Sequence, residues 1–149
     1  MKLISFKHNN GESFGVVTDQ GVVDLKKQFN DKYNNLKSFL QDNGAEKLHS
    51  VNLDQVDYQL EDVKLLPVIT NPEKIICAGV NYDEHRIEAN REKTEYPTIF
   101  FRVAESQIAH EDPIILPIES DKLDYEGEIA VVIGKEARRV SEEEAFDYI

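Results

Sequence analysis

Residues 124–135 read Asp-Tyr-Glu-Gly-Glu-Ile-Ala-Val-Val-Ile-Gly-Lys, an acidic start followed by an apolar run. In a β-strand, side chains two residues apart share one face, so Asp124, Glu126 and Glu128 would lie side by side. Carboxylates this close repel one another unless water solvates the face, the carboxyls share protons, or a hard cation such as Mg²⁺ or Mn²⁺ lies between the oxygens. The stretch therefore predicts a strand that runs into a core, with a solvated acidic end or a metal site at its start.

The composition is that of a globular protein that does not bind nucleic acid. The chain has 149 residues, 40% hydrophobic and 31% charged, enough for one domain or for a small domain and part of another. Its net charge of −12 leaves no stripe of Lys and Arg to neutralise phosphates. No apolar stretch approaches the roughly 18 residues that span a bilayer, and the start is too polar for a signal peptide. We therefore expect a cytoplasmic protein with no membrane or nucleic-acid partner.

The beginning of the chain predicts an antiparallel β-meander. Short apolar runs alternate there with turn residues, which is the pattern of strands joined by tight turns. The runs cover residues 3–6, 14–17 and 22–23, and the turns cover 9–11 and 19–21.

A short helix and a domain boundary are expected after the meander. Within residues 34–41 the apolar side chains fall at helical spacing, and Asn43-Gly44 supplies a stop signal. The stretch after Val63 is extended and contains two prolines, Pro67 and Pro72. We therefore place the boundary of a small N-terminal domain near residue 70.

The second half predicts strands around a polar excursion. The apolar run after Lys74 predicts a buried strand that ends at Gly79, and strand character resumes at 97–101. The charged segment between them, 82–96, is expected to lie on the surface, where function-bearing groups are common. Two further strands are expected, at 113–116 and 126–133.

The single cysteine, Cys77, lies in the first of these strands and cannot form an internal disulfide. Its apolar neighbours favour a buried structural thiol over a nucleophile.

The last residues predict an incomplete helix. Ser141 and Glu144 have the spacing of a capping box, which marks the start of a helix. Only eight residues follow Ser141, and isolated helices that short are marginal. We therefore expect the chain to stop within an element, so that the domain over 71–149 is incomplete.

A histidine and a glutamate stand three residues apart in the polar excursion, at His85 and Glu88. On a helical turn these positions are neighbours on one face. A carboxylate beside an imidazole holds its tautomer and raises its basicity, which makes a general base for water. The same spacing also occurs in ordinary surface pairs, so both interpretations stay open from the spacing alone.

Several motifs follow one another in a characteristic order between residues 74 and 135. They are Lys74-Ile-Ile-Cys-Ala-Gly-Val-Asn81-Tyr82-x-x-His85-x-x-Glu88, then Pro97-x-x-Phe100, then Pro117, then Leu123-Asp124-Tyr125-Glu126-x-Glu128-x-Ala-Val-Val-Ile-Gly134-Lys135. In this order they resemble the fumarylacetoacetate hydrolase superfamily. The N-terminal meander also resembles the small domain that precedes the catalytic domain in bacterial members.

The resemblance implies an α+β fold that is mostly β. A small antiparallel β/α domain over residues 1–70 would precede part of a mixed β-roll catalytic domain over 71–149, in a homodimer. The resemblance also implies a Mg²⁺ or Mn²⁺ ion held by Glu126, Glu128 and a later Asp. Asp124 is then expected behind these two ligands, at the end of the strand.

The same resemblance assigns the polar excursion to a lid that carries the catalytic dyad His85 and Glu88. Tyr82 and Arg102 are implied as substrate-binding residues. The family commonly has Lys where this chain has Arg102. Because Arg binds a carboxylate as a two-pronged fork, substrate preference is expected to differ.

The implied activity is metal-dependent hydrolysis of a carbon–carbon bond in a small 2-oxo or 2,4-dioxo acid of the acylpyruvate or fumarylacetoacetate type. Oxaloacetate decarboxylation and dienedioate isomerisation are alternatives within the family, and a non-catalytic binding module is the alternative outside it. The third metal-binding carboxylate of the family lies beyond Ile149, so we expect this chain alone to be inactive.

Overall fold

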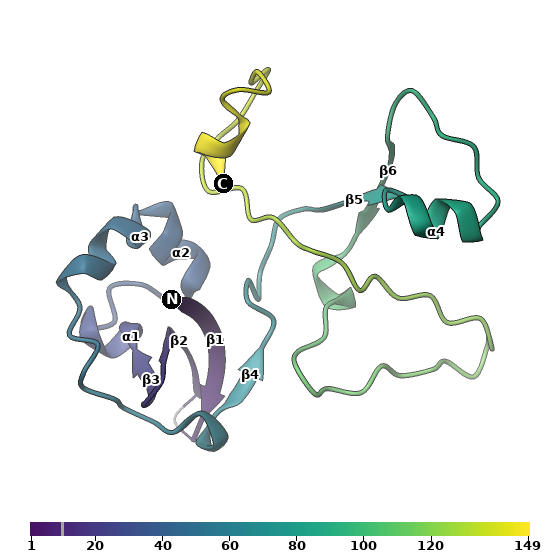
Figure 1. The fold of residues 1–149 in the computed structure, drawn as a ribbon. Helices are drawn as coiled ribbons and strands as arrows, with labels where there is room; N and C mark the ends of the chain where they lie inside the picture. Colours follow the sequence, from purple (N-terminus) through teal and green to yellow (C-terminus); the bar gives the residue numbers. More distant parts are fainter. Residues whose placement is uncertain (10) are drawn as a thin grey trace.

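The computed structural model describes residues 1–9 and 11–149, and its first part is a four-stranded antiparallel sheet (Figure 1). The strands are β1 (Lys2–His8), β2 (Gly11–Thr18), β3 (Gly21–Asp24) and β4 (Lys64–Leu66), in the order β3-β2-β1-β4. The predicted meander is confirmed. Its first predicted turn includes Asn10, which lies outside the described residues.

Three short helices lie beside this sheet. They are α1 (Leu25–Gln28), α2 (Leu36–Gln41) and α3 (Gly44–Lys47), with single 3-10 turns at Leu48–Ser50 and Leu60–Asp62. The helix predicted over 34–41 is confirmed as α2. It begins with a capping box between Asn35 and Ser38, and Asn43 after its end has φ of 52°, which stops the helix as predicted.

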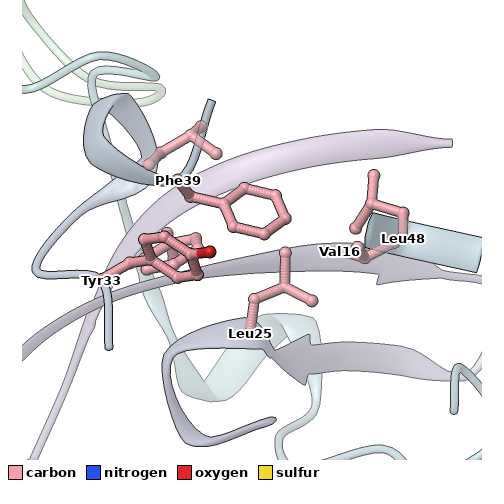
Figure 2. Packing of buried hydrophobic residues seen from close by; sticks show 7 residues of the cluster. Val16, Leu25, Tyr33, Phe39 and Leu48 are labelled. Carbon is pink, nitrogen blue, oxygen red and sulfur yellow. The ribbon is translucent and has the colours of Figure 1, made fainter. Parts of the chain in front are cut away.

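The core of the N-terminal part lies between the sheet and the helices. Phe14 and Val16 are two residues apart on β2 and therefore point to one face. There they pack with Leu25, Tyr33, Leu36, Phe39 and Leu48. Figure 2 shows the labelled side chains of this cluster pointing toward one another from the strand, from the helical segments and, for Tyr33, from the loop before α2. A second cluster of Phe6, Val22 and Val63 covers the other side of the sheet.

A second sheet of two strands follows along the chain, with a helix between the strands (Figure 1). Strand β5 (Ile75–Gly79) pairs antiparallel with β6 (Thr98–Arg102), and Cys77 lies opposite Phe100. Helix α4 (Asp83–Glu88) and an exposed loop connect the two strands. Both strands and the surface excursion between them were predicted, and they are confirmed. The predicted burial of the first strand is wrong, since β5 has no fully buried residue and Ile76 is 58% exposed.

The first and second halves of the chain are joined by side-chain bonds near the predicted boundary. The Lys64 Nζ lies 2.9 Å from the Asp112 carboxylate, and the Lys37 Nζ lies 2.8 Å from that of Glu73. The division near residue 70 stays a prediction.

The predicted strands at 113–116 and 126–133 are wrong. After β6 the described chain contains only 3-10 turns, at Ala104–Ser106 and Ala145–Tyr148, and no further strand. An extended segment becomes a strand only when a neighbour takes its backbone N–H and C=O groups. Side chains in both segments stay exposed, with Ile115 and Ile129 each 83% accessible.

The predicted C-terminal helix is also wrong, since only the 3-10 turn forms there. The Ser141 hydroxyl donates to the Glu144 carboxylate at 3.1 Å. A capping box instead needs the Ser oxygen to accept from the backbone N–H three residues on. The remaining architecture confirms the α+β, mostly β fold class. Among the helices of residues 1–9 and 11–149, none has the length and hydropathy to cross a membrane.

Candidate active site

The site begins where strand β5 ends and α4 starts. After Gly79, Val80 has φ of 53°, a left-handed conformation that is rare for a β-branched residue. Tyr82 then precedes the helix in an extended conformation, half-exposed and without a side-chain cap bond. Asp83 and Glu84 lie in the first turn, where their negative charges interact favourably with the positive end of the helix dipole.

The predicted dyad lies on this helix. His85 and Glu88 are both within α4, three residues apart, and therefore on one face. Both side chains are exposed to solvent. The helical turn that the dyad hypothesis requires is therefore present, and the catalytic role of the pair stays a prediction.

Between these two residues, Arg86 makes contacts that the sequence analysis missed. Its Nε lies 3.3 Å from the Asp83 carboxylate, and its guanidinium donates to the Arg91 carbonyl at 2.9 Å. The opposite charges of Asp83 and Arg86 at i,i+3 were a visible signal for the first contact. The second contact goes to a backbone oxygen, for which the sequence carries no pattern.

The acidic pair lies near the β5–β6 strands. Burial raises the pKa of the Cys77 thiol, and the carboxylates of Glu126 and Glu128 raise it further, whereas the Arg102 guanidinium opposes them. All three charges therefore lie within electrostatic range of Cys77. The thiol is half-buried rather than fully buried, and its raised pKa fits the predicted structural role better than a nucleophile.

Arg102 ends strand β6 opposite Ile75. Its side chain is half-buried, and its Nε donates to the Ser106 hydroxyl at 3.5 Å. Arg102, Glu126 and Glu128 come from distant parts of the sequence, and all three affect the pKa of the Cys77 thiol.

The other predicted groups are not assembled with them. Asp124 is exposed, and the side-chain bonds of α4 stay within residues 83–91. No group of three or more His, Cys, Asp or Glu side chains suited to a metal occurs among residues 1–9 and 11–149. The described chain therefore holds the predicted residues in separate places, His85 and Glu88 on helix α4 and the acidic pair Glu126 and Glu128 in a later segment.

These groups define a class of protein. An α+β scaffold that offers an imidazole and a carboxylate on one face of an exposed helix, together with the half-buried guanidinium of Arg102, suits a site for a small anionic molecule. The fold itself is similar to that in the crystal structure of a putative HpcE protein from Mycobacterium smegmatis. The TM-score is 0.64 at 22% identity, over 78% of this chain and 41% of that chain.

The family follows from the sequence of the second half. The fumarylacetoacetate (FAA) hydrolase C-terminal family matches residues 74–149, about half of the chain. The chain belongs to the fumarylacetoacetate hydrolase family. The matched segment contains every predicted site residue, from Tyr82 to Glu128.

Named relatives agree with this assignment. The chain is 35% identical to the fumarylacetoacetate hydrolase domain-containing protein 2 homolog of Dictyostelium discoideum, over all of this chain and 51% of that protein. It is 46% identical to the mitochondrial oxaloacetate tautomerase fahd2 of Xenopus laevis, over 59% of this chain and 28% of that protein. It is 43% identical to the oxaloacetate tautomerase YisK of Bacillus subtilis, over 62% and 32%. The chain spans about half the length, or less, of these relatives.

Proposed function

We propose that this chain belongs to an enzyme that acts on oxaloacetate or a closely related 2-oxo acid by moving a proton beside the keto group. The observation that carries the proposal is that one family segment, 74–149, contains the His85–Glu88 helix, Arg102 and the acidic pair Glu126 and Glu128. The frog and bacterial relatives named as oxaloacetate tautomerases support the substrate class.

The negative charge of the substrate is opposite to the positive charge of Arg102, so the two attract. Oxaloacetate carries two carboxylates, and the Arg102 guanidinium can donate two parallel N–H bonds to one of them. Tyr82 stands at the start of the lid helix, where its hydroxyl can donate to the bound acid. Together these two residues would orient the keto group toward the dyad.

The dyad would then transfer the proton. The His85 imidazole takes a proton from the carbon next to the keto group, and the released electron pair forms the carbon–carbon double bond of the enol. The imidazolium returns that proton to the former keto oxygen, so that no proton is gained or lost overall. Glu88 orients the imidazole and stabilises its protonated form.

Glu126 and Glu128 are the residues that would hold a divalent cation. Carboxylate oxygens are the donors that Mg²⁺ and Mn²⁺ prefer, and Mg²⁺ is commonly bound through one or two carboxylates together with substrate oxygens. Both residues influence Cys77, so they come near the same point of strand β5. When bound, the cation would polarise the keto oxygen. Asp124 would add negative charge nearby.

Hydrolysis of a carbon–carbon bond in an acylpyruvate is a second candidate, favoured by the name of the matched family. The same residues would serve it, with His85 activating water instead of removing a carbon-bound proton.

Whichever reaction applies, we propose that the enzyme acts as a homodimer. The exposed apolar side chains of the strand pair, such as Ile76 and Phe101, support such an association.

In the intact enzyme, His85→Ala is expected to lower kcat for enol–keto conversion of oxaloacetate by about 100- to 10,000-fold, the usual contribution of a general base. The KM should change little, because the imidazole is not assigned to substrate binding. Enol absorbance would be followed in the presence of Mn²⁺, with His110→Ala as the control, since His110 is also exposed but lies outside α4.

Equal rates for both variants would remove His85 from the mechanism. Turnover of an acylpyruvate without turnover of oxaloacetate would favour the hydrolase. The absence of both activities in the intact enzyme at saturating Mn²⁺ would favour a non-catalytic module.

A further inference from the structure

Arg86 is the single half-buried side chain in the exposed segment 82–96. Its two bonds reach opposite ends of α4. The Nε contact to Asp83 lies in the first helical turn, and the guanidinium bond to the Arg91 carbonyl lies beyond the last turn. One side chain therefore connects the start of the helix to the residue that follows its end.

Helix α4 has little else to stabilise it. It is six residues long, contains no buried residue and lacks a side-chain N-cap bond. Isolated helices of this length are marginal in water, and packing of an apolar face normally stabilises them. Since α4 has no buried face, local bonds decide whether it stays helical.

The end of α4 adds backbone bonds that depend on the same residues. Asn90 has φ of 49°, and its N–H donates to the Ile87 carbonyl at 3.0 Å. The Arg91 N–H donates to the Arg86 carbonyl, also at 3.0 Å. These two bonds form a Schellman motif. The Arg86 side chain donates to the carbonyl of Arg91, the last residue of this motif, and so adds a third bond to it.

The helical state matters for the dyad. In a helix, residues three apart share one face, whereas in an extended chain they point to opposite faces. His85 and Glu88 are therefore neighbours only while α4 is helical.

We propose that Arg86 is a positioning residue, which keeps His85 and Glu88 on one face of α4 by bonding both Asp83 and Arg91. This inference rests on the proposed function for the role of the dyad, but its geometry is testable separately. Arg86 does not touch the reacting atoms.

The test compares Arg86→Gln with Arg91→Gln in the full chain. Both variants remove one positive charge from the same segment, but the Arg91 carbonyl that accepts the Arg86 bond survives its side-chain change. The first measurement is the nuclear Overhauser effect between His85 Hα and Glu88 Hβ, which reports the helical turn directly. The second is the kinetics of oxaloacetate conversion.

We expect Arg86→Gln to weaken the His85–Glu88 signal and to lower kcat about two- to fivefold, the effect of losing an exposed ion pair of typical strength. KM and thermal stability should stay close to wild type, because α4 contains no buried residue. Arg91→Gln should behave as wild type. Arg86→Lys should be intermediate, since an ammonium keeps the charge but lacks the fork that reaches both partners.

Equal signals in the Arg86→Gln and Arg91→Gln chains would overturn the inference. A parallel change in KM and kcat would overturn it as well, since it would assign Arg86 to binding. An intact enzyme without turnover of oxaloacetate would contradict the proposed function alone, because the Overhauser comparison does not depend on activity.

Discussion

Asp42 shows how one exposed residue can connect separate segments. Its carboxylate accepts bonds from the Tyr33 hydroxyl at 2.5 Å, the Lys32 Nζ at 2.9 Å and the Lys47 Nζ at 2.7 Å. These partners come from the loop before α2 and from α3. The bonds from Lys47, Tyr33 and Lys32, in that order, hold the pKa of the Asp42 carboxyl far below its ordinary value of 3.8.

Asp42→Asn is expected to lower the free energy of unfolding at neutral pH. Because the pKa of Asp42 is lower in the folded state than in the unfolded state, its contribution is present in full above the ordinary pKa of 3.8 and is lost as the pH falls through the folded-state value. Urea unfolding of both chains at several pH values should give a gap that is constant near neutrality and shrinks below about pH 4.

The control for this experiment is Asp19→Asn. Asp19 is an exposed acid in the turn between β2 and β3. A gap of the same size and pH dependence for Asp19→Asn would mean that the Asp42 bonds contribute nothing specific.

At the scale of elements, the sequence predicted what depends on local pattern. Helix α2 follows from apolar spacing and a stop signal, and strand β5 follows from an apolar run that finds its partner β6. The run at 126–133 has an equally strong pattern, yet it forms no strand. A pattern tells which residues suit a strand, whereas the strand itself also requires a partner with free backbone groups.

The candidate site likewise has features that the sequence pattern predicts and features that it does not. The helical spacing of His85 and Glu88 could be predicted, because i,i+3 neighbours are fixed by helix geometry. The common effect of Arg102 and the acidic pair on the pKa of Cys77 could not be predicted from spacing, because these groups come from distant segments. The Arg86 bond to the Arg91 carbonyl was missed, since every residue offers a backbone oxygen.

The capping of α2 gives a prediction at this scale. The Asn35 side chain accepts from the Ser38 N–H at 2.9 Å, and the Asn35 N–H donates to the Ser38 hydroxyl at 3.3 Å. Asn35→Ala removes the first of these bonds and should lower the free energy of unfolding by about 1 kcal/mol. Urea denaturation measures the difference. The neighbouring exposed residue Asn34 supplies the control, and an equal loss in Asn34→Ala would contradict the capping role.

At the scale of the whole molecule, the two halves differ in how many of their apolar side chains are buried. Nearly all the buried hydrophobic side chains lie between Phe6 and Val63, with Ala109 as the exception in the second half of the described chain. The second half exposes large apolar residues, among them Ile118, which is 99% accessible. Because exposed apolar surface favours association, the second half is where the proposed homodimer contact is expected.

The charge of the whole molecule determines how metal binding has to be measured. A net charge of −12 attracts divalent cations to the entire surface, so Mn²⁺ binding alone would not identify a site. Exposed, dispersed charges are screened at about 0.15 M salt, whereas carboxylates that contact the ion directly are screened much less. A titration in such salt therefore separates direct ligation from general attraction.

We expect calorimetric titration of Mn²⁺ into this chain to give a saturable signal that is abolished in Glu126→Gln and in Glu128→Gln. An amide keeps the size of the side chain but removes the charge that binds the ion. Glu119→Gln is the matched control, because Glu119 is exposed in the same half of the chain. It should bind as wild type does. If all three variants bind Mn²⁺ equally, the cation is attracted by the overall charge, and the acidic pair is the solvated face that its spacing also allowed.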